Sequence, residues 1–439
     1  MLIENINIKN EPFLFDKVGR VVIKEDKVLR IITNDTYIKL YKELLNSPDI
    51  NNLFSKGLIE TKIYSESKED SILILEHKKI NFMLHPSEYT NKMFWDVAYM
   101  YISLCKELYN NHGILTVDAH PWNVTFEGTK ATFFDFSSLY KGNVIGKNWI
   151  DEFGKYFAIP IRLASISKKT FPLSLEYRRE HLNGFGLSFL NKRLIKKLFN
   201  KKFESISKYK GRPNDVFDKI LDWLDKNKPI NAKNEYWLNY EQSHLAEIGN
   251  PKTIKQKFVH KILSTKNPKT VLDLASNKGY YALMAEKLGA SVMAFDYEEE
   301  TINQCYYKAI DVESNITSAL MNFYLPTPPM GVGLMSKSAF DRLGSNIVLA
   351  LALVHHICLV QRIPVYIFCE ICKKYAKDGV MLEFIDPNDL HVKSWNADIP
   401  IDYNIDSICN YMKDKFPNVE KSENMINDGI NRQIMYFYN

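Results

Sequence analysis

Cysteine is scarce and scattered in this chain of 439 residues. It occurs six times, as Cys105, Cys305, Cys358, Cys369, Cys372 and Cys409. These positions form no disulfide framework for a chain of this size, so we expect a reducing compartment and a cytoplasmic protein. Cys369 and Cys372 form one CxxC pair, but no second pair and no histidine pair follows at zinc-binding spacing. The surrounding VYIFCEICKKYAK predicts an amphipathic helix in which both cysteines are structural.

Long hydrophobic runs and a strong excess of one charge are also missing. The most apolar stretch, NIVLALALVHHICLV, is too short to span a bilayer and contains two histidines. The first residues, MLIENINIKNEP, include acids and no apolar core, so we expect no signal peptide. The net charge is only +5, with lysines mixed among acids, which argues against a dedicated nucleic-acid binder.

The length of the chain predicts two domains, because 439 residues are too many for one compact core. With 46% apolar, 25% charged and 13% aromatic residues, the composition is that of a globular protein. The polar segment LDKNKPINAKNE, at residues 224–235, is the best linker candidate. We therefore expect one domain over residues 1–228 and a second over residues 229–439.

One segment of the first half, LSFLNKRLIKKLFNKKF at residues 187–203, predicts a helix with an apolar stripe and a basic face. Two interpretations follow. The favoured one is a surface helix with a solvated basic face. The other is a peripheral membrane contact, in which the helix docks on anionic lipid.

The second half of the chain alternates strand-like and helix-like segments, which predicts a doubly wound α/β sheet. The stretch TVLDLASNKGYYALMAEKLGASVMAFD contains one complete βαβ unit. Its first strand ends at Asp273, a loop of small and polar residues follows from Ala275 to Gly279, and the second strand ends at Asp296. Asp296 thus stands where nucleotide-binding folds place the acid that binds ribose hydroxyls.

The loop lacks the GxGxxG pattern of dinucleotide folds and instead resembles the first motif of class I S-adenosylmethionine-dependent methyltransferases. The resemblance covers about residues 235–439 and implies a Rossmann-like domain with S-adenosyl-L-methionine as cofactor. It assigns cofactor binding to Asp273, Ala275, Asn277, Gly279, Asp296 and Asn322. Ala275 departs from the family, which most often has glycine there. A Rossmann-like domain without the cofactor is the alternative.

His355 and His356 follow a strand that resembles the fourth strand of that family. Methyl transfer is an in-line displacement, for which the enzyme holds donor and acceptor in attack geometry. A hydroxyl acceptor also needs a base, and either histidine could serve. A phosphate or carboxylate acceptor needs none. The alternative for the pair is a structural role, in which one histidine packs and the other caps. Glu383 is a further candidate for substrate contact.

The first half contains Asp118, Asn123 and Asp135 around a short hairpin, in ILTVDAHPWNVTFEGTKATFFDFSSLY. Phosphoryl transfer needs a carboxylate facing the acceptor and oxygen ligands for Mg²⁺. The spacing resembles protein-kinase-like and aminoglycoside-phosphotransferase-like domains over about residues 10–225. That resemblance implies an α+β fold, Asp118 as the catalytic acid, Asn123 and Asp135 as Mg²⁺ ligands, and Mg-ATP as a possible cofactor.

The first half also lacks a glycine-rich phosphate loop, and Thr116 stands where kinases usually have histidine. Lys24, Lys27 or Arg30 would have to bind the phosphates, with Glu43 as a partner. Both an active phosphotransferase and a pseudokinase scaffold remain open.

Together the two halves resemble bacterial enzymes that modify surface polysaccharides. The expected activity is methylation of a glycan, its precursor or a related small molecule. The alternatives are a bifunctional kinase-methyltransferase and a non-catalytic adaptor.

Overall fold

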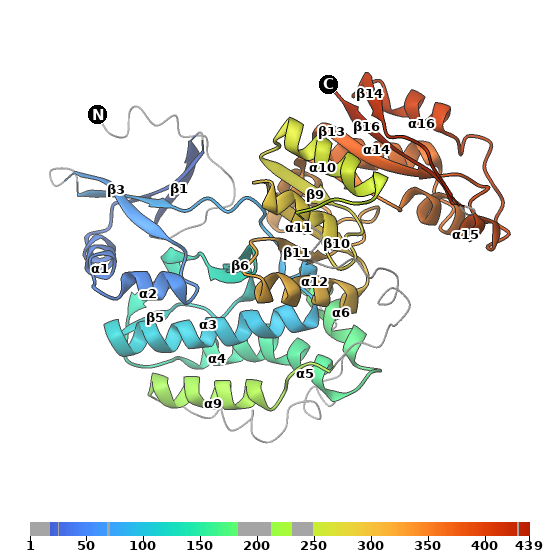
Figure 1. The fold of residues 1–439 in the computed structure, drawn as a ribbon. Coiled ribbons are helices and arrows are strands. Elements are labelled where there is room, and N and C mark those ends of the chain that lie inside the picture. The colour runs from blue at the N-terminus through green and yellow to red at the C-terminus, as the bar shows by residue number, and fades with distance from the viewer. Residues whose placement is uncertain (1–17, 25, 68–70, 183–211, 231–248, 428–429) are drawn as a thin grey trace. The chain divides into compact units, whose positions relative to one another are not determined.

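The chain separates into two compact units in the computed structural model (Figure 1). The model describes residues 18–24, 26–67, 71–182, 212–230, 249–427 and 430–439. Unit 1 comprises Met1–Ala232 with Met330–Ser336, and unit 2 comprises Lys233–Pro329 with Lys337–Asn439. The basic segment 187–203 and residues 231–235 of the expected linker lie outside the described residues.

Unit 1 begins with a four-stranded antiparallel sheet. In spatial order its strands are β1 (Gly19–Lys24), β2 (Lys27–Ile32), β4 (Ile72–His77) and β3 (Thr61–Ser67). The first two form an antiparallel hairpin, and apolar and polar residues alternate along it. Helix α1 (Asp35–Leu45) follows β2 and starts at Asn34, whose side chain accepts a hydrogen bond from the backbone N–H of Thr36.

The remainder of unit 1 is mainly helical. Its described helices are α2 (Ile50–Ser55), α3 (Asn91–His112), α4 (Lys147–Phe153), α5 (Ile159–Ile166), α6 (Phe171–Leu182) and α9 (Pro213–Asp225). The longest, α3, ends at Gly113, which has φ +61° as a left-handed helix cap requires. Four short strands follow it, namely β5 (Ile114–Thr116), β6 (Val124–Glu127), β7 (Lys130–Phe133) and β8 (Leu139–Lys141). Strands β6 and β7 form the expected hairpin, with its turn at Gly128.

Unit 2 is built on an eight-stranded sheet. The spatial order is β11 (Thr317–Leu320), β10 (Ser291–Asp296), β9 (Thr270–Asp273), β12 (Ser345–Ala350), β13 (Ala376–Ile385), β16 (Ile430–Tyr438) and β14 (Asn418–Lys421), with β15 (Met425–Asn427) on β16. The five strands from β11 to β13 run parallel. Strand β16 is antiparallel to both of its neighbours β13 and β14. The parallel part matches the prediction of a doubly wound sheet, whereas the reversed strand was not predicted.

Helices accompany these strands in the expected alternation. They are α10 (Ile254–Lys266), α11 (Tyr280–Lys287), α12 (Glu299–Asp311), α13 (Ala339–Leu343), α14 (Val365–Tyr375), α15 (Leu390–Lys393) and α16 (Ile405–Met412). The central strands read as continuous apolar runs because both faces are covered. Helix α14 confirms the amphipathic prediction, since Cys369 and Cys372 are fully buried on its inner face and remain unbonded thiols.

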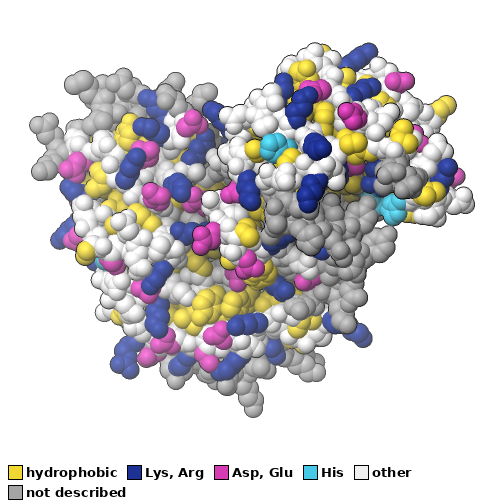
Figure 2. Space-filling model, viewed as in Figure 1, with side chains coloured by type: hydrophobic (Ala, Val, Ile, Leu, Met, Phe, Trp, Pro, Cys, Tyr) yellow, Lys and Arg dark blue, Asp and Glu magenta, His cyan; other side chains and the backbone are white. Residues whose placement is uncertain are grey.

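The distribution of charge on the surface agrees with the mixture of acidic and basic residues in the sequence. On the face that Figure 2 shows, Lys and Arg side chains are interspersed with Asp and Glu rather than gathered by sign. Among the described residues, no helix is both long and apolar enough to cross a bilayer.

Candidate functional site

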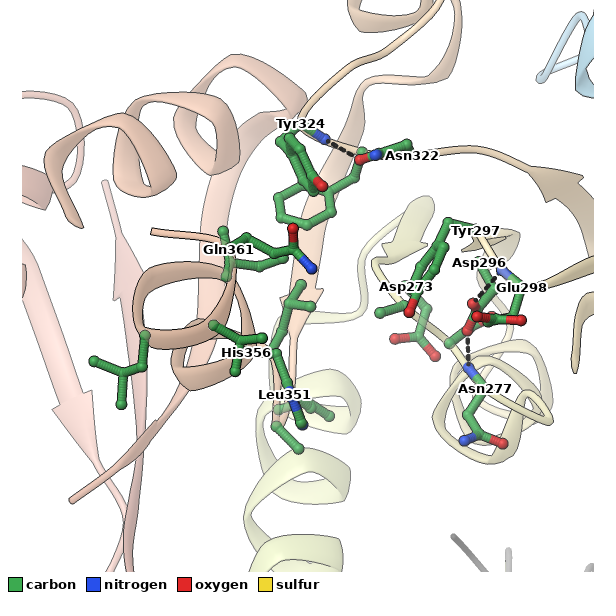
Figure 3. A pocket seen from close by; sticks show the side chains of 18 of the residues that line it. Asp273, Asn277, Asp296, Tyr297, Glu298, Asn322, Tyr324, Leu351, His356 and Gln361 are labelled. Atoms are coloured by element: carbon green, nitrogen blue, oxygen red, sulfur yellow. Dashed lines mark hydrogen bonds between the residues drawn. The ribbon is translucent and has the colours of Figure 1, made fainter. Parts of the chain in front are cut away.

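A cavity of about 1120 Å³ opens in unit 2 at the carboxyl ends of its parallel strands (Figure 3). Its walls come from the loops after β9, β10, β11 and β12, together with residues of α10, β16 and the segment after α15. The chain reverses its strand order between β9 and β12. Open α/β sheets bind their ligands at this switch point, because the loops of the two neighbouring strands diverge there.

The loop after β9 is tightly bent. Ala275, Asn277 and Gly279 have φ values of +53°, +52° and +79°. The backbone N–H of Ser276 donates to the carbonyl of Phe295 at 2.7 Å and so ties the loop to the end of β10. A Cβ at Gly279 would lie 2.6 Å from Cys305 Sγ, so this glycine is required by both conformation and space. Ala275 takes up a left-handed conformation that costs an L-residue about 1–2 kcal/mol.

Asp296 ends β10 inside the cavity wall. Its carboxylate accepts hydrogen bonds from the backbone N–H groups of Asn277, at 3.1 Å, and Glu298, at 3.0 Å. Burial raises the pKa of Asp296 to about 6, although these two N–H donors act in the opposite direction. Each carboxylate oxygen has a second lone pair, so the group can still accept two hydroxyl donors.

The other residues assigned to the cofactor lie around the same space. Asp273, Asp296 and Glu298 lie close together on the right of Figure 3. Asn322 follows β11, and its side-chain oxygen accepts a hydrogen bond from the backbone N–H of Tyr324 at 3.3 Å. The structure thus brings five of the six assigned residues into the cavity wall. Gly279 stands behind it, as the cap of α11.

The two histidines have different positions. His356 lines the cavity, whereas His355 is 0% exposed and its ring packs parallel to Trp395 at 5.4 Å. Burial, followed by the neighbouring histidines and cations, lowers the pKa of His355 to about 2 and that of His356 to about 4. A general base works best when its pKa is near the working pH. His356 is therefore a weak base in this protein.

Two ion pairs involve residues of the cavity wall. Lys255 of α10 lies 2.7 Å from Glu383 of β13, and Arg432 of β16 lies 2.9 Å from Asp389. Lys255 and Arg432 line the cavity. Glu383 is buried against Lys255 and is absent from the cavity wall, so it supports a wall residue instead of meeting substrate. Sequence reasoning missed Lys255, Arg432 and Trp395, since no local motif marks them.

The kinase-like motif of unit 1 also converges. Asn123 Nδ2 donates to Asp118 Oδ1 at 2.6 Å, and Asp135 caps the turn that begins at Phe136 by accepting from the N–H of Ser137 at 3.1 Å. Burial, with the charges of Asp135 and Glu152, raises the pKa of Asp118 to about 6. Asp135 is therefore close enough for its charge to act on Asp118.

The phosphate-binding candidates are arranged differently from the expectation. Arg30 is buried in β2, with its Nε 3.2 Å from His77 Nε2. Burial lowers the pKa of Arg30, while the charge of Asp135 acts in the opposite direction. Lys24 and Lys27 are exposed at the hairpin tip. Glu43 is half exposed and pairs with Lys39 and Lys141 instead of Arg30.

Comparison with known proteins gives one full-length similarity. No family model matches the chain. The nodulation protein NoeA of Rhizobium meliloti (strain 1021) is 22% identical over 442 residues, covering 92% of this chain and 91% of the relative. The similarity therefore extends through both units.

Similar solved structures are S-adenosylmethionine-dependent methyltransferases. The bifunctional kinase-methyltransferase WbdD is 14% identical with a TM-score of 0.34, over 45% of this chain and 42% of that chain. The match thus spans less than half of the WbdD chain. Magnesium protoporphyrin IX methyltransferase (ChlM) from Synechocystis PCC 6803, with bound SAH, is 13% identical with a TM-score of 0.33, over 47% of this chain and 91% of that one. The N-methyltransferase NodS from Bradyrhizobium japonicum WM9 is 9% identical with a TM-score of 0.31, over 43% and 89%.

Proposed function

We propose that this chain is an S-adenosylmethionine-dependent methyltransferase that acts on a glycan, a glycan precursor or a related small molecule. The observation that carries the proposal is the placement of Asp296 and the bent Ala275–Gly279 loop at the switch point of the unit 2 sheet. The order of the strands supports it. The parallel strands β10, β9 and β12 end at the same cavity, and the carboxyl ends of strands at a switch point are where open α/β sheets bind their ligands.

The residues of the cavity fit the donor. Asp296 would accept the ribose hydroxyls, while Asn322 with Met321 and Phe323 would border the adenine. Asp273, Asp296 and Glu298 concentrate negative charge on this side, which suits a sulfonium cation. At about 1120 Å³ the cavity exceeds the roughly 300–1,000 Å³ of a drug-sized ligand site, so donor and acceptor fit together.

The main task of the protein in methyl transfer is to position the donor and the acceptor. As the acceptor attacks, a new bond to the methyl carbon forms and the S–CH₃ bond breaks, so the donor leaves as a neutral thioether. The cavity holds both partners in line and excludes water. His356 is the nearer histidine, but its low pKa makes it a weak base by itself. A hydroxyl acceptor therefore needs further help to lose its proton, and an anionic oxygen needs none.

Calorimetric titration of the full chain with S-adenosylmethionine, and separately with S-adenosylhomocysteine, tests this proposal. We expect one site per chain, occupied at micromolar ligand. Absence of heat up to millimolar ligand from a folded protein would remove the methyltransferase assignment and leave the non-catalytic adaptor. If binding is found, transfer of a labelled methyl group to candidate glycans identifies the acceptor.

Phosphoryl transfer by unit 1 is the second candidate function. The specific observation in its favour is the hydrogen bond from Asn123 to Asp118, together with the charge of Asp135, which contributes to the raised pKa of Asp118. A kinase-like site that also binds Mg-ATP would make the chain a bifunctional kinase-methyltransferase. A site that does not bind it would be a pseudokinase scaffold.

A further inference from the structure

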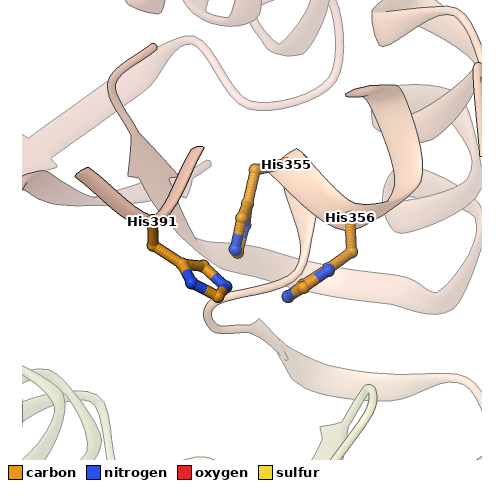
Figure 4. Close-up of side chains that lie close together, drawn as sticks. All are labelled: His355, His356 and His391. Carbon is orange, nitrogen blue, oxygen red and sulfur yellow. The ribbon is translucent and has the colours of Figure 1, made fainter. Parts of the chain in front are cut away.

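Three histidines from two segments of unit 2 meet beside the cavity. His355 and His356 begin the helical turn η8 (His356–Val360), and His391 belongs to α15. One ring nitrogen from each lies within 4.8 Å of the corresponding nitrogens of the other two. Figure 4 shows the three rings turned toward one common space. The cluster thus joins residues that are distant in sequence.

The ring of His355 is buried with both of its nitrogens unsatisfied within the described part of the chain. The residue is 0% exposed, yet neither ring nitrogen has a hydrogen-bond partner among the described residues. An unsatisfied buried polar group costs about 1–3 kcal/mol, and a ligand that takes up its lone pair removes that cost. Trp395 holds the rings in place, with ring centroids 5.4 Å from His355, 5.0 Å from His356 and 4.9 Å from His391.

The nearby charges leave room for a cation. Arg432 and Lys255 line the same cavity as His356 and Trp395. Both are in ion pairs, Arg432 with Asp389 at 2.9 Å and Lys255 with Glu383 at 2.7 Å. The two carboxylates balance the two cations, so the cluster does not stand in an excess of positive charge.

We infer that His355, His356 and His391 bind one divalent transition-metal ion, with a coordination position left open toward the cavity. Three imidazoles and an open position are a ligand set of catalytic Zn²⁺ sites. Zn–N bonds of about 2.0–2.1 Å place the nitrogens about 3.4 Å apart, so the rings close by about 1 Å on binding. Because His356 and Trp395 line the cavity, the open position faces the acceptor.

This site deepens the proposed function, and only its role toward the acceptor rests on that function. A bound Zn²⁺ would lower the pKa of a hydroxyl that approaches it and so help that hydroxyl to lose its proton. The hydroxyl proton goes to solvent, the O–CH₃ bond forms as the S–CH₃ bond breaks, and S-adenosylhomocysteine leaves. Metal binding itself requires no methyl transfer.

The test uses the untagged full chain after treatment with a chelator. Zn²⁺ binding is followed by calorimetry, and Co²⁺ binding by the strong visible absorption of the tetrahedral ion. We expect one ion per wild-type chain. Since even second-shell changes cost 10–100-fold, His391→Gln should bind at least about a hundredfold more weakly. His391 is partly exposed, so this variant should keep its fold, which circular dichroism checks. His260→Gln on α10 removes a histidine outside the cluster and should match the wild type.

Two results overturn the metal site. One is a wild type that binds neither ion at micromolar concentration, and the other is a folded His391→Gln that binds as tightly as the wild type. A parallel titration with S-adenosylhomocysteine separates this inference from the proposed function. Cofactor binding without metal binding refutes the metal site alone, and metal binding without cofactor binding refutes the methyltransferase alone.

Discussion

At the scale of single residues, two carboxylates stand at the two candidate sites, the buried Asp296 in unit 2 and the half-buried Asp118 in unit 1. Burial raises the pKa of each to about 6. A carboxylate held at such a pKa is partly protonated just below neutrality, so pH affects both its ligand binding and its contribution to folding. The two residues therefore give pH-dependent tests that need no knowledge of the acceptor.

Replacing Asp296 should weaken cofactor binding. Hydrogen bonds to a charged group contribute about 1.5–3 kcal/mol, so Asp296→Asn should raise the Kd of S-adenosylhomocysteine by roughly ten- to a hundredfold. In the wild type the Kd should also rise as the pH falls below about 6, since the acid then protonates. Calorimetry at several pH values measures both effects. Asp311→Asn, on the exposed end of α12, is the matched control. An unchanged Kd in folded Asp296→Asn removes this residue from the site.

Replacing Asp118 should stabilise the protein above neutral pH. The folded-state pKa is raised from 3.8 to about 6, so the stability linked to this group is present below about pH 4 and lost as the pH rises through 6. Asp118→Asn should therefore gain about 1 kcal/mol at pH 8, after allowance for partial solvent screening, and nothing at pH 4. Denaturant unfolding at both pH values measures the gain. The exposed control Asp151→Asn should stay within about 0.5 kcal/mol of the wild type. A gain of equal size at both pH values would contradict the electrostatic cause.

At the scale of elements, the loop between β9 and α11 combines two requirements. It has to expose its backbone to a ligand, and it has to turn sharply enough to start α11 at Gly279. Of the five residues from Ala275 to Gly279, three have positive φ, and two of these three are not glycine. The surrounding sheet therefore holds the loop in a backbone conformation that is strained at its non-glycine residues.

Relieving that strain should stabilise unit 2. Ala275→Gly removes a left-handed alanine at about 1–2 kcal/mol, less the extra chain entropy of glycine, so we expect a gain of about 0.5–1 kcal/mol. Ala282→Gly in α11 is the matched control, because the same change inside a buried helix should destabilise. Urea unfolding compares the two. Destabilisation by both substitutions would show that the methyl group of Ala275 contributes packing that outweighs the strain.

The elements also show how far the sequence alone leads. The βαβ unit that contains Asp273 and Asp296, and the amphipathic helix that contains Cys369 and Cys372, could be predicted, since each depends on residues near in sequence. The meeting of His356 with His391 and Trp395 could not, because it depends on how the chain folds back after β13. The reversed strand β16 was not predicted, since the residues of a strand carry no signal of the direction in which it joins a sheet.

At the scale of the whole molecule, each unit has its own sheet and its own buried core. Units of this kind unfold separately unless they are strongly coupled. We therefore expect two transitions in differential scanning calorimetry of the full chain. S-adenosylhomocysteine at about a hundred times its Kd should stabilise one of them by about 2.7 kcal/mol and leave the other in place. A single unfolding transition that shifts as a whole when S-adenosylhomocysteine is added would contradict the independent unfolding of the two units.

The unfolding transition that S-adenosylhomocysteine leaves unchanged tests whether Asp118, Asn123 and Asp135 form a phosphoryl-transfer site. If unit 1 binds Mg-ATP, the nucleotide should raise the transition that S-adenosylhomocysteine leaves unchanged. Asp135→Asn should abolish this rise, because it removes a proposed Mg²⁺ ligand. Asp151→Asn, which changes a carboxylate exposed on α4, should keep it. A wild type that is indifferent to millimolar Mg-ATP would identify unit 1 as a scaffold.

The reversed strand β16 has a consequence for synthesis of the chain on the ribosome. Strand β13 is apolar and buried over Gly379–Ile385, and it pairs with β16 through the same residues. Residues 430–438 are translated after every other strand of the sheet. Until they emerge, the nascent chain presents the unpaired edge of β13, which is a template for aggregation. Slow translation or a stall before residue 430 should therefore increase the dependence of this protein on chaperones.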